Sequence, residues 1–295
     1  MPKKILVILI FIGFTIISCK KNEYVENEFD ESGQIISKKI FDNKKNPIKS
    51  IKYYDRLENV EIKIILHKPD YDSVYVKYDN GFIFKRGKQT KNGNPYGIWN
   101  LYDKNENLRE IREWFVIKKQ SRINRVWYLN EKGDTLSKRY KDTIYNQIEF
   151  VNDTLGARRT TYNQFKFKKD TFSSNETLIA FANCASSTMN EYDSEIKVFL
   201  AKEDYNYNFD FSNDNDVKLD VFYSLKYDSI NQKWFETNDY GSVAIFHRKF
   251  NSSGEKILRG FMQEFSYGPF KNGEFDSLLG PKIFFEKRIF VKDTI

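Results

Sequence analysis

The chain has 295 residues, which is enough for one large domain or two ordinary ones, and a formal net charge of +7. Its 48 basic and 41 acidic residues are interspersed, so the sequence does not predict the basic face of a nucleic-acid-binding protein, and no nucleic-acid partner is expected. With only two cysteines, Cys19 and Cys184, the chain has no disulfide framework, and its aromatic residues, 17% of the total, must supply the core.

The first 19 residues predict export. Lys3 and Lys4 precede a short apolar run, and Ser18, a small residue, precedes Cys19. This order is typical of a signal peptide over residues 1–18. The run is also shorter than the roughly 20 apolar residues that a permanent membrane-spanning helix needs. The Ser18-Cys19 junction resembles the bacterial lipobox, and this resemblance implies that Cys19 is acylated and becomes the new N-terminus.

Residues 19–28 are polar, show no apolar periodicity and are predicted to form a tether. Lys20 follows the lipidated cysteine. An aspartate there is the inner-membrane retention signal of some Gram-negative bacteria, so Lys20 favours the outer membrane. We therefore expect a protein of the outer membrane that is anchored to this membrane by a lipid on Cys19. Both periplasmic and surface-exposed orientations stay open.

Residues 29–157 contain a repeat with steps of 24 to 26 residues. Aromatic residues recur at this spacing, and all but the last precede an aspartate: Phe29, Tyr54, Tyr78, Tyr102 and Tyr128. Turn-forming residues follow them, so each unit is predicted to hold a β-hairpin with its connection. Because a single hairpin is marginally stable, we expect the units to pair edge to edge into a meander.

The repeat resembles a known family in the unit Gly97-Ile98-Trp99-Asn100-Leu101-Tyr102-Asp103, which Asn107-Leu108 follows. This unit resembles a MORN-repeat variant of the YwqK type, which carries Gly-x-Trp-x-x-Tyr, a turn and an aliphatic residue. The resemblance covers about residues 29–136 and implies extended hairpin sheets and an antitoxin-like role. Other units depart from it, with Lys49 and Ile51 in place of the Gly and the Trp.

The aromatic residues of the repeat are the candidate ligand surface: Trp99, Tyr102, Tyr78 and Tyr54. The alternative is that they pack the sheet, because stripes of aromatic residues usually fill cores.

Residues 158–295 are predicted to form an all-β domain that folds on its own, because the repeat ends before residue 157. Seven strands are expected, over 178–181, 195–201, 217–226, 233–236, 242–249, 256–265 and 282–291. Short strands at this spacing favour a β-sandwich, and the lack of a long 3.6-residue period predicts little helix. The expected fold class is therefore all-β, with a β-hairpin repeat meander followed by a β-sandwich-like domain.

No catalytic residue and no cofactor is predicted. His67 and His247 are interpreted as surface residues, because imidazole metal sites usually need two or three histidines close together. A nucleophilic pair of Cys184 and His247 is conceivable, but the small apolar neighbours of Cys184 suit a buried, inert thiol. The chain contains no Gly-x-Ser-x-Gly elbow, phosphate loop or dinucleotide fingerprint.

One loop is a calcium candidate, because it has a side-chain oxygen at every second residue: Asp210, Ser212, Asp214 and Asp216. Asn215 stands where a calcium loop has glycine, and Val221 stands where it has a bidentate glutamate. The alternative is an exposed acidic hairpin tip.

Asp-Ser/Thr-aliphatic triplets recur along the chain and resemble the O-glycosylation acceptor of exported Bacteroidota proteins. Their hydroxyl residues are Ser73, Thr135, Thr143, Thr154, Ser229, Ser277 and Thr294. Simple turn chemistry is the alternative.

The sequence leaves three functions open. The first is a non-enzymatic envelope module that binds protein or glycan through its sheet surface. The second, implied by the resemblance of the repeat, is an antitoxin-like or immunity lipoprotein. The third is a hydrolase with an unrecognised site, for which a pocket holding His247 with a carboxylate and Ser or Cys would be the sign.

Overall fold

The structure is a computed structural model that describes residues 23–55, 60–133, 138–140, 143–145, 150–151, 154–155, 162–186, 189, 193–237, 239–269 and 275–293. Cys19 and the expected signal peptide lie outside these residues. Across the described ranges the regular structure is nearly all β-strand, which confirms the all-β fold class. No helix within them is long and apolar enough to cross a membrane.

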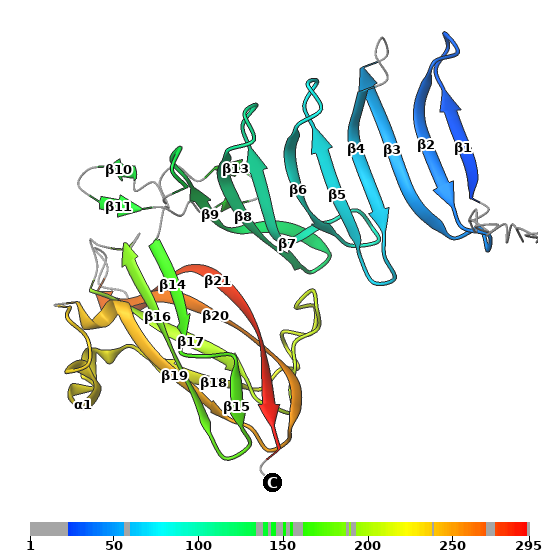
Figure 1. Cartoon of the computed structure of the whole chain (residues 1–295). Coiled ribbons are helices and arrows are strands. Elements are labelled where there is room, and N and C mark those ends of the chain that lie inside the picture. The colour runs from blue at the N-terminus through cyan, green and yellow to red at the C-terminus, as the bar shows by residue number, and fades with distance from the viewer. Residues whose placement is uncertain are drawn as a thin grey trace, which may run out of the picture.

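Nine strands form one antiparallel sheet, and each pairs with the next in chain order (Figure 1). They are β1 (Tyr24–Phe29), β2 (Ile35–Phe41), β3 (Pro47–Asp55), β4 (Val60–His67), β5 (Asp72–Lys77), β6 (Ile83–Gln89), β7 (Pro95–Tyr102), β8 (Leu108–Ile117) and β9 (Gln120–Tyr128). The predicted meander is therefore confirmed, and one repeat unit corresponds to two strands with their two turns.

The turns after β1, β2, β5, β6 and β7 share one hydrogen-bonding pattern. Between β1 and β2, Asp30 N–H donates to Gln34 O and Gly33 N–H donates to Asp30 O. The residue at the fourth turn position has a left-handed backbone, with φ of 85° at Gly33 and 64° at Glu106. That conformation matches a type I turn followed by a bulge, the usual way to close a three-residue hairpin loop.

The turn at Tyr78 corrects the sequence alignment of the repeat. Here Tyr78 N–H donates to Phe82 O and Gly81 N–H donates to Tyr78 O, so Tyr78 itself opens the turn. In the first unit the opening residue is Asp30, one position after the aromatic residue. Tyr78 is thus out of register by one residue with Phe29. Asn80 compensates, because its Oδ1 accepts from Phe82 N–H.

Neighbouring turns are also joined to each other at the spacing of the repeat. Tyr78 Oη donates to Tyr102 O at 2.8 Å, and Asn80 Nδ2 donates to Lys104 O at 3.3 Å. At the opposite ends of the strands, Asn94 Nδ2 donates to Lys119 O at 3.0 Å. These side chains satisfy carbonyl groups that the sheet ladder leaves free, each contributing about 1 kcal/mol.

The C-terminal part is a sandwich of two sheets. One sheet has the order β14 (Tyr162–Phe167), β16 (Thr177–Ser186), β19 (Val243–Lys249). The other has the order β15 (Thr171–Ser173), β21 (Phe275–Lys292), β20 (Gly254–Pro269), β17 (Ser194–Ala201), β18 (Leu219–Tyr223). A core that includes Leu178, Ile196, Phe246 and Phe285 lies between them. Two small hairpins precede the sandwich: β10 (Lys138–Tyr140) with β11 (Thr143–Tyr145), and β12 (Phe150–Val151) with β13 (Thr154–Leu155).

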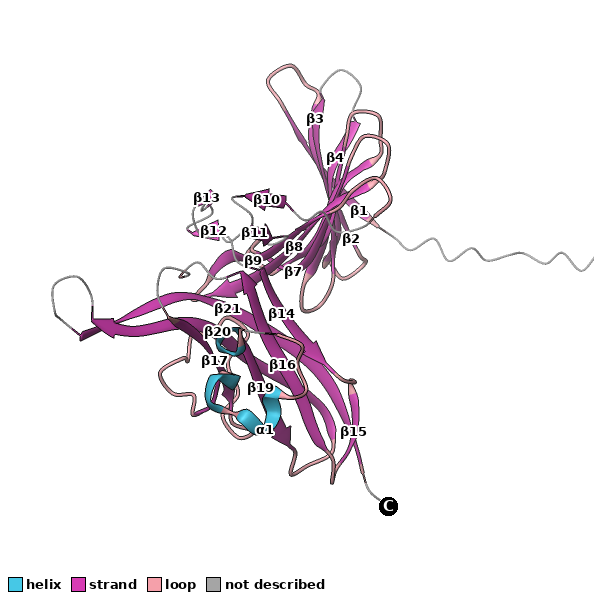
Figure 2. Cartoon of the chain, turned by 90° about the vertical axis from the view of Figure 1, so that its left-hand side faces the viewer, coloured by secondary structure: helices cyan, strands magenta, loops and turns pink. Residues whose placement is uncertain are grey.

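Helix is scarce in the described residues, as predicted. It is limited to η1 (Leu225–Tyr227), α1 (Ser229–Gln232) and η2 (Tyr240–Ser242), which lie beside the sandwich (Figure 2). The strand expected over 233–236 is wrong, while the other six each contain a strand. The reason is the cap of α1: Asp228 Oδ1 accepts from Asn231 N–H, and Trp234 N–H then donates to Asn231 O. This turn carries the chain away from any strand partner.

The meander and the sandwich meet at one end of the nine-stranded sheet (Figure 1). Phe115 and Ile117 of β8 pack with Tyr207 and Phe211 of the loop between β17 and β18, and with Phe284 of β21. The Phe115 ring centroid lies 5.9 Å from that of Phe211 and 6.1 Å from that of Phe284. Part of the outer face of the five-stranded sheet is therefore covered by the meander.

Candidate functional site

The aromatic residues predicted as a ligand surface are not gathered on one open face. Trp99 is buried, its indole N–H donates to Lys88 O at 2.9 Å, and its ring lies over Gly87. Tyr78 and Tyr102 are half-buried, and burial raises the pKa of Tyr78. The side chain of Tyr54 lies outside the described residues. Where they are described, these rings pack the sheet and its turns.

The calcium candidate loop contacts the turn between β8 and β9. Lys118 N–H donates to Asp210 O, and Lys118 Nζ forms an ion pair with Asp214 at 3.1 Å. Asp210 Oδ1 accepts from Ser212 N–H, and its hydrogen bonds with Ser212 lower the pKa of Asp210. Within the described residues, no three acidic, His or Cys side chains are placed to hold a metal ion. Asn208 Nδ2 also donates to Ser212 Oγ, so three of the four predicted ligand side chains, those of Asp210, Ser212 and Asp214, make intramolecular contacts.

The glycosylation triplets are placed in different settings. Asp72 and Ser73 begin β5, and Asp72 is buried. Ser229 is exposed at the start of α1, and Asp228 is its cap. The hydroxyl side chains of the other five triplets lie outside the described residues. Modification of these triplets stays a prediction, and Ser229 is the described hydroxyl most open to it.

Cys184 and His247 do not form a nucleophilic pair. His247 lies opposite Ile179 in the β16–β19 ladder, five positions along β16 from Cys184, which corresponds to about 16 Å. Cys184 is buried in the core, as expected, whereas His247 is exposed and its ring contacts Phe222 at 5.2 Å.

His67 lies in a chain of hydrogen bonds that the sequence did not reveal. Its Nε2 is 2.9 Å from Ser50 Oγ, and its Nδ1 is 3.0 Å from Asp72 Oδ1. A carboxylate can only accept, so Nδ1 donates to Asp72 and a neutral ring accepts from Ser50. Lys91 Nζ is also 2.9 Å from Asp72. Burial acts to raise the pKa of Asp72, but Lys91 and His67 outweigh it and the pKa is lowered.

These hydrogen bonds join three strands, β3, β4 and β5, and only the register between the strands brings Ser50, His67 and Asp72 together. His67 pairs directly with Asp72 across a short turn, so their closeness could have been expected from the sequence. Ser50 lies 17 positions before His67, and no spacing rule points to it.

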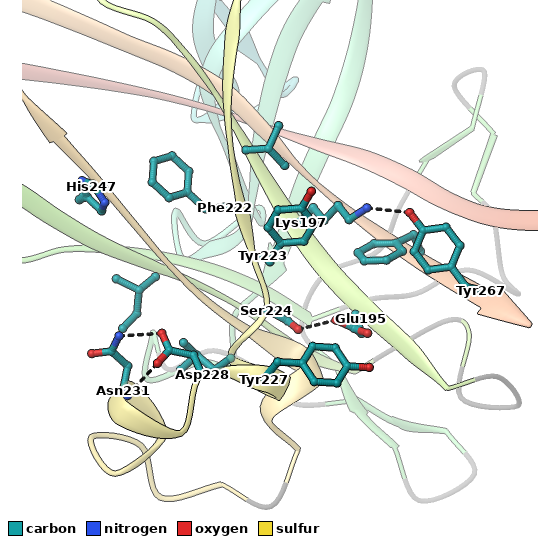
Figure 3. A pocket seen from close by; sticks show the side chains of 14 residues that line it. Glu195, Lys197, Phe222, Tyr223, Ser224, Tyr227, Asp228, Asn231, His247 and Tyr267 are labelled. Atoms are coloured by element: carbon teal, nitrogen blue, oxygen red, sulfur yellow. Dashed lines mark hydrogen bonds between the residues drawn. The ribbon is translucent and has the colours of Figure 1, made fainter.

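The sandwich carries an open pocket of about 770 Å³ where β17, β18 and β20 meet η1 and α1 (Figure 3). We call it the aromatic pocket. Three of its tyrosines are unusually exposed, with Tyr223 at 63%, Tyr227 at 81% and Tyr267 at 64%. Ile245 and His247 of β19 also line it. In Figure 1, α1 lies on the side of the sandwich away from the meander.

Lys197 orders two of these tyrosines. Its ammonium lies 5.1 Å from the ring centroids of both Tyr223 and Tyr267, and 3.8 Å from that of Phe265. It also donates to Tyr267 Oη at 2.8 Å. A cation so placed attracts the negative faces of the rings. The rings are thereby held in position although their outer surfaces face solvent.

The polar side chains of the aromatic pocket are also fixed by hydrogen bonds. Ser224 Oγ donates to Glu195 Oε2 at 2.7 Å, and Asn231 Nδ2 donates to Asp228 Oδ2 at 2.7 Å. The hydrogen bonds from Asn231 lower the pKa of Asp228. Lys226 lies 3.8 Å from Glu195, so the charge of this carboxylate is partly compensated.

The residue types expected for a hydrolase are present here, but they are arranged differently. Ser224 donates to Glu195, and His247 lies on the opposite side of the pocket (Figure 3). No hydrogen bond joins His247 to Ser224, both of which are described. The pocket therefore offers aromatic faces and fixed polar groups in place of a nucleophile with its base.

Sequence comparison adds no relative to this picture: the chain matches no protein-family model and no curated protein.

Proposed function

We propose that this chain is a non-enzymatic binding protein of the bacterial envelope, anchored through Cys19 to the outer membrane, which holds a neutral glycan in the aromatic pocket. The observation that carries the proposal is the exposure of Tyr223, Tyr227 and Tyr267 around fixed hydrogen-bonding groups. The large apolar area of these exposed rings is removed from water only when a ligand covers them.

A sugar ring matches this surface chemically. Its C–H face is apolar and stacks on an aromatic ring, while its hydroxyl groups need donors and acceptors at the rim. Glu195, Asp228 and Asn231 supply such groups. The ammonium of Lys197 is already engaged by three rings, and Glu195 by Ser224 and Lys226. A neutral ligand therefore suits the pocket better than a charged one.

Binding to a panel of neutral oligosaccharides, measured by titration calorimetry, tests the proposal. Tyr223→Ala and Tyr267→Ala should each weaken binding roughly threefold to tenfold, the loss expected for one aromatic contact. Tyr24→Ala is the matched control, because Tyr24 is an exposed tyrosine on β1. Equal affinity in all three variants, or no affinity in the wild type, would contradict a glycan site here.

A hydrolase is the second candidate, and the Ser50–His67–Asp72 chain favours it. The polarity of its hydrogen bonds is the one that activates a serine in acyl transfer. Labelling by a fluorophosphonate, followed by mass spectrometry, should then modify Ser50 and fail in His67→Gln. Ser32, exposed in the first turn, is the control serine. If Ser50 is not labelled, the hydrogen bonds of Ser50, His67 and Asp72 are a polar link between three strands and not a catalytic site.

The antitoxin-like role rests on the resemblance of the repeat, and co-purification with a toxic partner is its test.

A further inference from the structure

One face of the meander carries a groove with a volume of about 550 Å³ that runs across β4 to β8. We call it the cationic groove. Its apolar lining includes Trp99, Trp114 and Leu101, and its charged lining consists of Lys63, Lys85 and Arg112. No carboxylate lines it among the residues that the structure places there.

Strand register brings the cations to the same face. Lys52 pairs with Lys63, and both Lys63 and Lys85 pair with Val76 on either side of β5. Lys63 and Lys85 are thus two strands apart, or about 10 Å between backbones. Like charges directly opposite each other, as Lys52 and Lys63 are, destabilise a sheet, so their position calls for a physical reason.

Two of these charges have no carboxylate partner in the part of the chain that the structure describes. Arg112 Nε is 2.5 Å from Glu110 Oε1, so this guanidinium is paired. No carboxylate in the described residues lies within ion-pair distance of Lys63 or Lys85; the Lys85 ammonium has only the Phe84 ring, at 5.5 Å. Burial, followed by the charge of Lys52, lowers the pKa of Lys63. Burial, followed by Arg112 and Lys63, lowers the pKa of Lys85.

We propose that the cationic groove binds a small amphiphilic organic anion, with its apolar body against Trp99 and Trp114 and its anionic head between Lys63 and Lys85. Charge complementarity selects the anion, because the described residues of the lining include uncompensated positive charges and no acid. The half-buried Trp114 selects an apolar body, because a purely inorganic ion would leave the exposed part of its indole uncovered. The volume lies within the range of roughly 300–1,000 Å³ that is typical of small-molecule sites.

A matched pair of fluorescent probes tests this proposal. 8-Anilinonaphthalene-1-sulfonate carries a sulfonate on an aromatic body, and N-phenyl-1-naphthylamine has the same rings without the charge. Wild-type protein should bind the sulfonate at least tenfold more tightly than the neutral probe. Energy transfer from tryptophan to the bound sulfonate should fall in Trp114→Phe.

The deciding variant is Lys63→Met with Lys85→Met. It should lose at least tenfold in affinity for the sulfonate and keep its affinity for the neutral probe. Because it removes mutual repulsion, its melting temperature should not fall, so loss of fold would not explain the result. Lys39→Met with Lys44→Met is the control, since both lysines are exposed around β2.

Unchanged sulfonate binding in the double variant, or equal affinity of the wild type for both probes, would overturn the proposal. The outcome is independent of the proposed glycan site, because Tyr223→Ala alters the sandwich and leaves the cationic groove intact. A sulfonate that still binds Tyr223→Ala therefore separates the two sites.

Discussion

Asn124 of β9 binds the main chain of Phe284 in β21 through both ends of its side-chain amide. Its Oδ1 accepts from Phe284 N–H at 2.8 Å, and its Nδ2 donates to Phe284 O at 2.8 Å. The residue is buried, and its Nδ2 also lies 2.6 Å from Glu113 Oε2. One side chain of the meander thus continues the hydrogen bonding of a sandwich strand.

We expect Asn124→Ala to lower the free energy of unfolding by about 2–4 kcal/mol, because it leaves two main-chain groups of Phe284 without partners in a buried site. Urea denaturation followed by circular dichroism measures this change. Asn92→Ala is the control, since Asn92 is exposed in the turn between β6 and β7. A loss no larger than that of the control would show that water replaces the amide.

Gly87 is required where the Trp99 indole lies across β6. A Cβ atom at position 87 would overlap the ring. Gly87→Ala should therefore cost about 1–3 kcal/mol, the usual cost of overpacking. Chemical denaturation measures the cost, and Trp99→Leu should remove most of it in a double-mutant cycle. Additive effects of the two substitutions would contradict direct overlap.

Asp103 should titrate far below an ordinary aspartate. Burial acts to raise its pKa, but hydrogen bonds from Asn107 and Arg109 outweigh it and hold the pKa at about 2. Because the folded pKa is depressed, the stabilising contribution of the carboxylate is present above the ordinary value of 3.8 and is lost as pH falls towards 2. Carboxyl NMR shifts measured against pH check this value. Arg109→Met should raise the pKa of Asp103, whereas Lys104→Met should leave it nearly unchanged.

A fragment of residues 158–295 should fold cooperatively, because the core around Phe246 and Phe285 lies within the sandwich. It should unfold at a lower urea concentration than the full chain, because Phe211 and Phe284 lose Phe115. Circular dichroism during urea titration measures both points. A fragment without a cooperative transition would show that the meander completes the sandwich core.

Cys19→Ala should release the protein from membranes or block its processing, because stable anchoring needs the acyl chains that the cysteine would carry. Fractionation of cells after a carbonate wash measures the partition. Retention of the variant in the membrane fraction at the wild-type level would rule out lipidation as the anchor.

Periodicity made the fold largely predictable. Aromatic residues followed by turn formers gave the hairpins, and alternating apolar residues gave six of the eight strands of the sandwich, all but β14 and β15. The prediction was wrong where a local side-chain hydrogen bond to the main chain had more influence than the periodicity of the sequence. Tyr78 opens its own turn because Asn80 supplies the cap, and Asp228 starts α1 where an extended segment was expected.

The candidate sites were much less predictable, because they depend on strand register. The aromatic pocket requires Lys197 opposite Tyr223 and Glu195 opposite Phe265, pairings between strands distant in sequence. The cationic groove likewise requires Lys63 and Lys85 on one face. Trp99 and Tyr102 were candidates for one ligand surface, with packing of the sheet as the alternative, yet residues three apart on a strand point to opposite faces.

The bonds between neighbouring turns make the meander a one-dimensional array, in which each hairpin is held mainly by the two beside it. Its free end is weak, because every residue of β1 is exposed. A pull on the N-terminal end would therefore detach the hairpins one at a time, beginning with β1, and each detached hairpin would lengthen the chain. With the proposed lipid anchor at Cys19 and the proposed glycan site on the sandwich, the nine-stranded sheet would then act as an extensible, self-restoring spacer between the two.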